Sequence, residues 1–512
     1  MKNLYFNKFV DFIVDKSHKV EKIFMILVLI SVICYPFVGV NYDLSQYLPG
    51  YAPSKQALDV MEEEFGYPGM ARIMLEDVSL YEAKTISDKI SKVDGVDMVM
   101  GVDTFSDIYM SKDFIKLDNL TDFYKDNCAV IQVVFEGGDS DKQTHKAIDE
   151  IKKITGEDAR FSGSAVSKKS IQESVSRELK IAIIVSLVII FLILTVTTTS
   201  WYEPILFVSV MCIAIIINMG TNIIFGTISF FTFSTAAILQ LAVSMDYSIF
   251  LLDMFTYYKK QGMDIKPALK EAIKASASSI LASGATTIVG FLVLVIMEFK
   301  IGTDMGLVLA KGIAISLITV LCLMPALILR NNKRVEKYAH KQIIPELTCV
   351  GNFMYKIRRF ILLIAVIIAV PCYVGQSMNT FKYGDAAIGA GHGTEFYEDS
   401  KVIDEKFGKS NMLLAIIPNT SNVKEKQLTD AINDYNFVNY AVSLAGTLPS
   451  GLPESFLPEE LVSQLHTDDY ARIIISINTD EESDYAFDCV NKLQNIVKSY
   501  YDNGYVLGMT TS

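Results

Sequence analysis

The stretch "SMDYSIFLLD", residues 244–253, decides the class of protein to which this chain belongs. It lies within a run from Phe230 to Met254 whose other residues are almost all apolar or hydroxylated. Such a run is long enough to cross a bilayer, which takes about 20 apolar residues. A carboxylate at the centre of a membrane helix costs about 2.5–3.5 kcal/mol, so Asp246 is expected to face a protein interior and to serve a function.

The composition indicates a protein that is part membrane and part water-exposed. Of the 512 residues, 51% are hydrophobic and 20% are charged, with a mean hydropathy of +0.33. This is too apolar for an ordinary soluble enzyme and too charged for a chain that lies wholly in the membrane. The net charge is −12, and the acids concentrate in residues 41–179 and 379–512. No basic surface for nucleic acid is predicted.

Seven apolar stretches are long enough to span a bilayer. They are Ile23–Val40, Ile181–Thr197, Pro204–Ile224, Phe230–Met254, Ile280–Met297, Met305–Leu329 and Ile361–Gln376. The first follows a basic N-terminus, as a signal peptide would, but no small-residue cleavage site follows it. We therefore expect it to be a retained anchor.

The basic loops predict the orientation of these spans. Residues 1–22, 255–278 and 330–359 are rich in Lys and Arg, which places them in the cytoplasm. Both long polar segments are then extracytoplasmic, and the protein is expected to be a multi-pass protein of a bacterial cytoplasmic membrane. Within 255–278, the spacing of Ile265 and Ile273 predicts an amphipathic helix on the inner membrane surface.

The chain nearly repeats itself. "EKIFMILVLISVICYPFVGV" (21–40) and "RRFILLIAVIIAVPCYVGQS" (358–377) are each followed by an extracytoplasmic segment with a Phe-Gly pair, at 65–66 and 407–408. Each segment then shows two strand-helix-strand units, which predicts a split βαβ, ferredoxin-like domain. The predicted helices are about Leu80–Ile90, Lys142–Ile154, Val423–Asp434 and Tyr485–Tyr501.

The predicted fold class is an α-helical polytopic membrane protein with α+β extracytoplasmic domains. Its predicted parts are an N-terminus with the first span (1–40), a first α/β domain (41–179), spans two to six (180–330), a cytoplasmic linker (331–359), a seventh span (360–378) and a second α/β domain (379–512). Copying the first repeat would require roughly 180 further residues. We therefore expect a truncated chain, or an oligomer or partner chain that supplies a second membrane block.

This arrangement resembles the resistance-nodulation-division (RND) transporters, and among them the mycobacterial membrane protein large (MMPL) family. The resemblance rests on "LAVSMDYSIFLL" (241–252), "SSILASGATTIVGFLVL" (278–294) and "GLVLAKGIAISLITVLCLMPALI" (306–328). It implies a secondary active transporter, not an enzyme, that uses the proton gradient to export lipids or other amphiphilic molecules. In the family, Asp-Tyr pairs in the fourth and tenth spans relay protons, and the first pair maps here onto Asp246 and Tyr247.

The chemistry of these residues agrees with a proton relay. A carboxyl group in a low-dielectric site favours its neutral form, so it can load and release a proton. None of the five histidines falls in a predicted span, which makes Asp246 the leading proton carrier. Tyr247 could donate to the carboxylate or line its access path, although membrane tyrosines often merely pack. Ser244 and Ser248 could hold water beside it.

Three further residues extend the predicted proton path. Asp253 lies about two turns beyond Asp246 and either passes protons to the cytoplasm or sits near the headgroups. Lys311 either neutralises ionised Asp246 or reaches the outer interface. Thr287 belongs to a stripe of small residues that either packs helices together or slides beside Asp246. The members of this stripe are Ser279, Ser283, Thr287 and Gly290.

Two other functions compete with transport. One is a membrane receptor or assembly scaffold that transports nothing, and the other is a protein-export accessory similar to SecDF. An enzyme is not favoured, because His145, His392 and His466 lack any surrounding catalytic or metal-ligand pattern. No metal or cofactor is expected. Cys128 and Cys489 either form a disulfide or are two unpaired buried thiols.

Overall fold

The computed structural model describes residues 2–66, 68–102, 123–156, 158–340, 348–379, 393–409, 411–447, 459–479, 483–508 and 510. They form two compact units. The membrane unit comprises Met1–Asn41 and Ser176–Phe381, and the α/β unit comprises Tyr42–Val175 and Lys382–Ser512.

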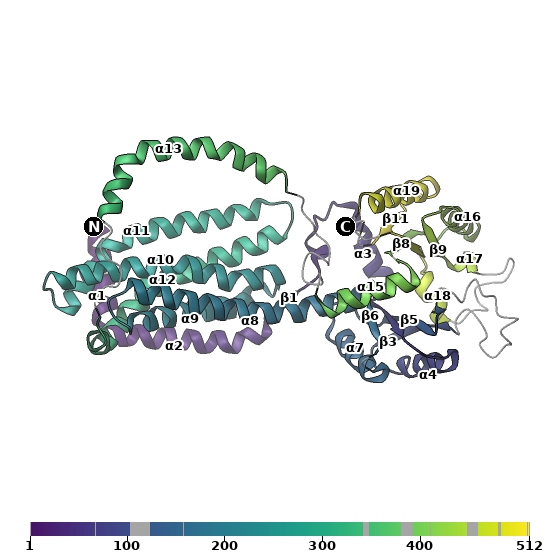
Figure 1. Cartoon of the computed structure of the whole chain (residues 1–512), viewed down its shortest axis with the longest axis horizontal. Coiled ribbons are helices and arrows are strands. Elements are labelled where there is room, and N and C mark those ends of the chain that lie inside the picture. The colour runs from purple at the N-terminus through teal and green to yellow at the C-terminus, as the bar shows by residue number, and fades with distance from the viewer. Residues whose placement is uncertain are drawn as a thin grey trace. The chain divides into compact units, whose positions relative to one another are not determined.

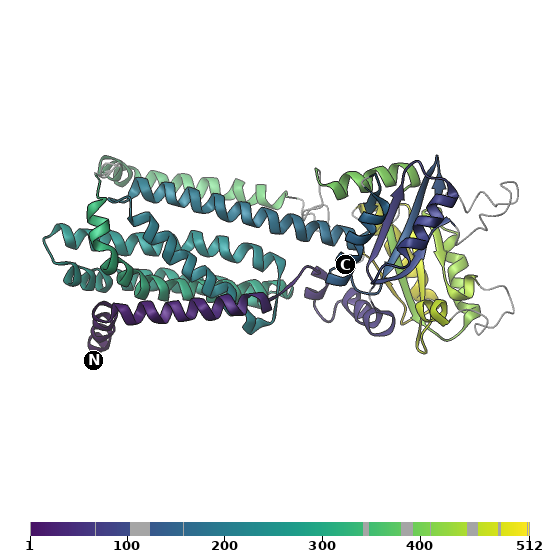
Figure 2. The same cartoon turned by 90° about the horizontal axis from the view of Figure 1, so that it is seen from below.

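Long helices build the membrane unit, and most of them run side by side over much of their length (Figure 1 and Figure 2), whereas the helix Thr348–Ser377 bows away from the others in Figure 1. They are α1 (Lys2–Asp15), α2 (Ser17–Cys34), α8 (Ser164–Thr197), α9 (Glu203–Thr221), α10 (Phe230–Lys260), α11 (Ile265–Val293), α12 (Ile301–Lys337) and α13 (Thr348–Ser377). Short 3-10 turns extend α2 (Tyr35–Phe37), α9 (Asn222–Phe225) and α11 (Leu294–Ile296). Seven of the described helices, all but α1 of this set, are long and apolar enough to cross a membrane.

The core of this unit lies among α9, α10, α11 and α12. One side chain from each helix, Phe207, Leu251, Ile273 and Val320, is at most 1% exposed in the same apolar cluster. Helix α12 is the most enclosed span. In its most apolar 18-residue stretch, 67% of the residues are buried, whereas none are buried in the corresponding stretch of α13. The described side chains of α13 are exposed along its length. Helix α10 packs against α9, α11 and α12, and a row of its residues is exposed.

The predicted surface helix around Ile265 and Ile273 is wrong. Helix α11 is continuous from Ile265 to Val293, and its first turns carry Leu269 and Ile273 into the apolar core instead of along a membrane surface. Helix α1 packs against this part of α11, and Lys270 binds Asp11 at 2.6 Å and Asp15 at 2.9 Å. The same apolar spacing is typical of a helix on a membrane surface and of a helix packed against another helix. Here neighbouring helices cover the apolar face of α11.

Local contacts fix where α10 begins. The Ser229 hydroxyl accepts the Thr232 N–H at 3.1 Å, which caps the helix. Asp304, in the first turn of α12, accepts the Ser229 N–H and the Thr232 hydroxyl at 2.7 Å each. The preceding strand β7 (Thr227–Ser229) pairs in parallel with β1 (Gly39–Asn41). These bonds set the depth of every later residue of α10 in the bundle.

The α/β unit contains two antiparallel sheets of the same topology. The first holds β2 (Met70–Leu75), β3 (Val96–Met100), β5 (Cys128–Phe135) and β6 (Arg160–Ser162), with β4 (Tyr124–Lys125) added to β5; its helices are α4 (Leu80–Ile90) and α7 (Lys142–Thr155). The second holds β8 (Asn411–Pro418), β9 (Val438–Val442), β10 (Tyr470–Ile477) and β11 (Tyr505–Leu507); its helices are α16 (Asn422–Asn433), α17 (Leu444–Thr447), α18 (Glu459–Leu465) and α19 (Asp484–Tyr500). In chain order, both sheets place the fourth strand beside the first, the first beside the third and the third beside the second.

This strand order is that of the ferredoxin-like split βαβ motif. The predicted fold class, a helical polytopic membrane protein with α+β domains, is therefore confirmed. Helix α8 begins at Ser164, so it contains residues on both sides of the predicted boundary near residue 180.

The helix that precedes each sheet covers the other sheet. Helix α3 (Pro53–Phe65) packs Ala57 and Met61 against Ile416 of β8. Helix α15 (Glu395–Phe407) packs Ile403 against Met74 of β2 and neighbouring residues of β5. Both helices end at a glycine with positive φ, Gly66 at 70° and Gly408 at 81°, which explains the repeated Phe-Gly pairs.

Candidate functional site

Helix α10 turns the Asp-Tyr pair in two directions. Asp246 is exposed on the surface of the membrane unit, whereas the next residue, Tyr247, is 4% exposed and packs in the apolar core. Successive helical residues are about 100° apart, so the two side chains leave the helix on different faces. Within the described part of the chain, no hydrogen bond or ion pair reaches Asp246, and none joins it to Tyr247. The described residues thus do not enclose Asp246 in the interior position expected for it.

The inner face of α10 is polar beside Tyr247. Ser244 and Ser248 are both 0% exposed, and the Ser248 hydroxyl donates to the Ser244 carbonyl at 3.4 Å. The hydroxyls of Ser244 and Tyr247 are buried and have no hydrogen-bond partner among the described residues. The sequence-predicted relay residues are therefore divided: Tyr247 and the two serines face inward, and Asp246 faces outward.

Asp253 shares the outward face with Asp246. It is exposed and lies seven residues further along α10, which is about two helical turns. The exposed residues of α10 before its last residue, Lys260, repeat at helical spacing from Leu239 onward. They are Leu239, Ala242, Asp246, Phe250, Asp253 and Tyr257. We call this set the outward stripe of α10.

The small-residue stripe of α11 is also largely uncovered. Ser279, Ser283 and Gly290 are exposed and Thr287 is half-buried, with its hydroxyl donating to the Ser283 carbonyl at 3.1 Å. A Cβ atom at Gly290 would have nothing within 4 Å among the described residues. The stripe therefore does not mediate close packing with a described helix, and its position is compatible with an external contact.

Lys311 is engaged away from Asp246. Its ammonium donates to the Asn218 carbonyl at 3.1 Å, to the Thr221 hydroxyl at 3.0 Å and to the Asn222 side-chain oxygen at 2.5 Å. These acceptors lie at the end of α9, where a cation is favoured by the helix dipole. Within the described part of the chain, Lys311 thus makes no bond to Asp246; it caps the end of α9 and lies over the Phe225 ring, at the end that the predicted orientation places nearer the outer side of the membrane.

A buried polar network near Lys311 is missing from the sequence prediction. The Asn218 amide donates to the Gln240 side-chain oxygen at 3.0 Å. The Gln240 amide in turn donates to the Gly312 carbonyl at 3.1 Å and to the Ser316 hydroxyl at 3.0 Å. An Asn and a Gln within apolar runs were the available signal, because uncharged amides in a membrane helix usually bind another helix.

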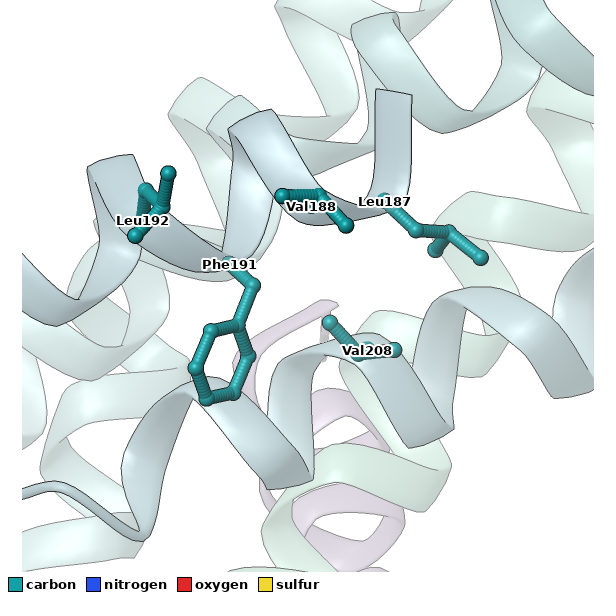
Figure 3. Close-up of a pocket in the computed structure, with 5 residues that line it drawn as sticks. All are labelled: Leu187, Val188, Phe191, Leu192 and Val208. Carbon is teal, nitrogen blue, oxygen red and sulfur yellow. The ribbon is translucent and has the colours of Figure 1, made fainter. Parts of the chain in front are cut away.

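An apolar groove lies between α8 and α9. Its volume is about 280 Å³, and it is lined by Leu187, Val188, Phe191, Leu192 and Val208. Figure 3 shows four of these side chains on one helix, with Val208 projecting from the neighbouring helix towards them. Every lining side chain is a hydrocarbon, so the groove can contact acyl chains but contains no side-chain group that binds a proton.

The cysteines and histidines are placed in separate surroundings. Cys128 and Cys489 are both buried free thiols, in different apolar clusters, so they are two unpaired thiols rather than a disulfide. The His145 ring lies 3.0 Å from the Asp139 carbonyl, and His466 lies 2.8 Å from Glu425. His392 is outside the described residues. Among those that are described, no three His, Cys, Asp or Glu side chains gather as a metal site would require.

Comparison with known proteins identifies the family. The MMPL family model matches residues 46–354, more than half of the chain. The sulfolipid-1 exporter MmpL8 of Mycobacterium tuberculosis is 26% identical over 309 residues, 56% of this chain and 28% of the relative. Membrane protein YdfJ of Bacillus subtilis is 21% identical over 284 residues, 52% of this chain and 38% of the relative. A membrane protein of Methanocaldococcus jannaschii, MJ1562, is 34% identical over 97 residues, 19% of this chain and 25% of the relative.

The aligned parts thus cover between 25% and 38% of the length of these relatives. The family match contains spans α8 to α12, including the Asp246-Tyr247 pair and the stripe of α11. This chain belongs to the MMPL family of RND-type membrane proteins.

Proposed function

We propose that this protein is a proton-driven exporter of lipids or other amphiphilic molecules, in which Asp246 carries the proton. The observation that carries the proposal is the position of Asp246, a carboxyl group halfway along a membrane-spanning helix. Retaining such a group is costly unless a protein or water-filled surface receives it. Moving one charge across the membrane yields about 2.3 kcal/mol per 100 mV, which is enough to bias a conformational change.

The outward stripe of α10 is proposed to meet a second membrane block. Two carboxylates, Asp246 and Asp253, lie on this face, and lipid tails cannot solvate either of them. The exposed small residues of α11 would let another helix approach closely beside them. A further part of the protein, a partner chain or a second copy could supply that block. Asp246 would then occupy the protein interior that its chemistry requires.

The proposed cargo follows from the relatives and from the apolar surface. MmpL8 is named as an exporter of a sulfolipid, and the groove between α8 and α9 presents only hydrocarbon. The basic ends of the spans favour a cytoplasmic location for α1 and for the turn between α10 and α11, with the α/β unit on the opposite side. Export from the cytoplasmic membrane outward is the direction that this orientation supports.

The test is made in the source organism, because its cells contain the natural cargo and the lipid that accumulates in them can be identified. Strains carrying Asp246→Asn, Asp246→Glu, Glu298→Gln or a gene deletion are compared by lipidomics of the cell surface and of the cell interior. We expect the deletion and Asp246→Asn to retain the same lipid inside the cell. Asp246→Glu, which keeps the carboxyl group, and Glu298→Gln, which alters an exposed loop residue, should export it normally.

A second candidate function is a scaffold that transports nothing, which the uncovered face of α10 and α11 also fits. It predicts that Asp246→Asn resembles the wild type while the deletion does not. Such a result, with the variant protein present at its normal level, would reject the proton-driven exporter. Collapse of the proton gradient by an ionophore provides an independent check, since it should stop export in the wild type.

A further inference from the structure

Helix α1 ends one residue before the first candidate span begins. Only Lys16 separates it from α2, which starts at Ser17. Lys16 has φ −113° and ψ 32°, which is not a helical conformation, so the chain changes direction there. Helix α1 consequently lies across the end of the helical bundle instead of running along it (Figure 1 and Figure 2). A helix in this position lies where the membrane meets water.

One side of α1 is fixed to the rest of the membrane unit. Val10, Ile13 and Val14 are at most 1% exposed and belong to the apolar core of the unit. On an adjacent face, Asp11 and Asp15 both bind Lys270 of α11. The orientation of α1 about its own axis is therefore set by protein contacts, which also decides which of its side chains stay outside.

A row of aromatic side chains occupies the outside of α1. Tyr5, Phe9 and Phe12 are 72%, 44% and 42% exposed. They are four and three residues apart, so they follow one another along a single face of the helix. Aromatic residues are enriched at membrane–water interfaces, where their rings sit at the level of the headgroups. We call these three residues the aromatic row of α1.

Two lysines flank the aromatic row. Lys8 precedes Phe12 by four residues and Lys16 follows it by four, so both lysines lie beside the row. The Lys16 ammonium is 5.7 Å from the centre of the Phe12 ring. Both lysines are exposed, and within the described ranges neither pairs with a carboxylate, since both acids of α1 bind Lys270. The outer face of α1 thus combines exposed rings with positive charges that no described acid neutralises.

We propose that α1 binds the anionic phospholipid surface of the cytoplasmic leaflet. The aromatic row inserts among the headgroups and the first carbons of the acyl chains, and the ammonium groups of Lys8 and Lys16 bind lipid phosphate. The basic residues before the first span place this end of the chain on the cytoplasmic side. Because α1 also holds Lys270, lipid binding fixes the first turns of α11 at the membrane surface. The inference does not depend on the proposed transport.

The depth of the aromatic row is tested by tryptophan fluorescence of the whole protein in phospholipid vesicles. Trp201 is the only tryptophan of the chain, so Trp201→Phe provides a background without tryptophan. In this background Phe9→Trp reports on the row. Asn7→Trp is the matched control, because Asn7 is exposed on the same helix about 160° away. Brominated lipid quenches tryptophan in the bilayer, whereas acrylamide, present on both sides of the membrane, quenches it in water.

We expect brominated lipid to quench Phe9→Trp several times more strongly than Asn7→Trp, and acrylamide to show the reverse order. Phe12→Trp, in the same row, should behave as Phe9→Trp does. Equal quenching at positions 9 and 7 would overturn the proposal. Protection of Phe9→Trp from both quenchers would also overturn it, because a protein segment or a second copy would then cover the row.

The preference for anionic lipid is tested with the same reporter. Vesicles of phosphatidylcholine are compared with vesicles that also contain phosphatidylglycerol. Lipid quenching of Phe9→Trp should rise with phosphatidylglycerol and fall again at high salt. Lys8→Gln combined with Lys16→Gln should abolish the rise, whereas Lys333→Gln combined with Lys337→Gln, which removes two exposed charges at the end of α12, should retain it. If phosphatidylglycerol has no effect, or if both double variants lose it equally, α1 does not bind anionic headgroups and the proposal fails.

Discussion

Asp399 of α15 accepts the Phe161 N–H of β6 at 3.1 Å through one carboxylate oxygen and the Arg160 guanidinium at 3.1 Å through the other. These two bonds attach a helix of the second repeat to the sheet of the first. Asp399 is 7% exposed, so its removal leaves a buried backbone N–H without its acceptor. Arg160 would retain Glu76, which it contacts at 2.8 Å.

Asp399→Ala should therefore weaken the α/β unit by about 1–3 kcal/mol. Thermal unfolding of the purified protein and hydrogen exchange of α15 would measure the effect. Glu405→Ala on the same helix is the control, because Glu405 is 67% exposed and its ion pair with Lys401 is 3.9 Å long. Its effect should stay within about 0.5 kcal/mol. Equal losses in both variants would show that the Asp399 bonds do not hold α15 in place.

Lys311→Met should lower stability because it leaves the end of α9 without its cation. Three acceptors lose a donor, and the expected cost is about 1–3 kcal/mol, measured as thermal unfolding in detergent. Lys300→Met, at an exposed position, is the control and should be close to neutral. If Lys311 neutralised Asp246 instead, Asp246→Asn would rescue Lys311→Met, and the two changes would not be additive. We expect no rescue.

The outward stripe of α10 predicts a protein contact at Phe250. A photoreactive benzophenone amino acid at Phe250 should crosslink to polypeptide in native membranes, whereas the same group at Phe191 on α8 should crosslink to lipid. The two positions are matched, being 39% and 38% exposed. Mass spectrometry of the crosslinked species would identify the second block. Lipid adducts alone at Phe250 would contradict the proposed contact.

The sequence predicts local elements better than their neighbours. Helix α4 occupies Leu80–Ile90 as predicted, because Ser79 and Glu82 form a capping box that marks its start. By contrast, the residues around Asp246 are apolar or hydroxylated on every side of the helix, so periodicity cannot reveal which face of α10 is covered. The sequence also does not show that α3 packs on the second sheet and α15 on the first. An apolar stripe predicts that a helix packs against a sheet, but it does not identify which sheet.

Close packing of α2 on α9 depends on Gly220. A Cβ atom there would lie 2.2 Å from the Ser31 carbonyl oxygen, so Gly220→Ala must separate the helices. The expected loss is about 1–3 kcal/mol, seen as a lower unfolding temperature in detergent. Gly375→Ala, in α13, is the matched control in a span, since no described atom lies within 4 Å of a Cβ atom there. It should be neutral or stabilise by up to about 1 kcal/mol. A neutral Gly220→Ala would mean that the two helices do not approach so closely.

His145 should make α7 less stable at acidic pH. Burial lowers the pKa of His145 below its ordinary value of 6.5, although the hydrogen bond to the Asp139 carbonyl opposes this shift. As the pH falls from 6.5 to the lower folded-state pKa, the unfolded segment takes up a proton that the folded segment does not. The stabilising contribution of the neutral His145 ring is therefore present in full above pH 6.5 and decreases as the pH falls from 6.5 to the folded-state pKa.

Hydrogen exchange of α7 in the whole protein, compared at about pH 7.5 and about pH 5.5 after correction for intrinsic rates, would measure this loss. His145→Gln keeps a donor for Asp139 but cannot titrate, so it should remove the pH dependence of α7. The measurement is confined to α7, the helix that carries His145. If His145→Gln retains the wild-type dependence, another group is responsible. Loss of the dependence in this variant alone assigns it to His145.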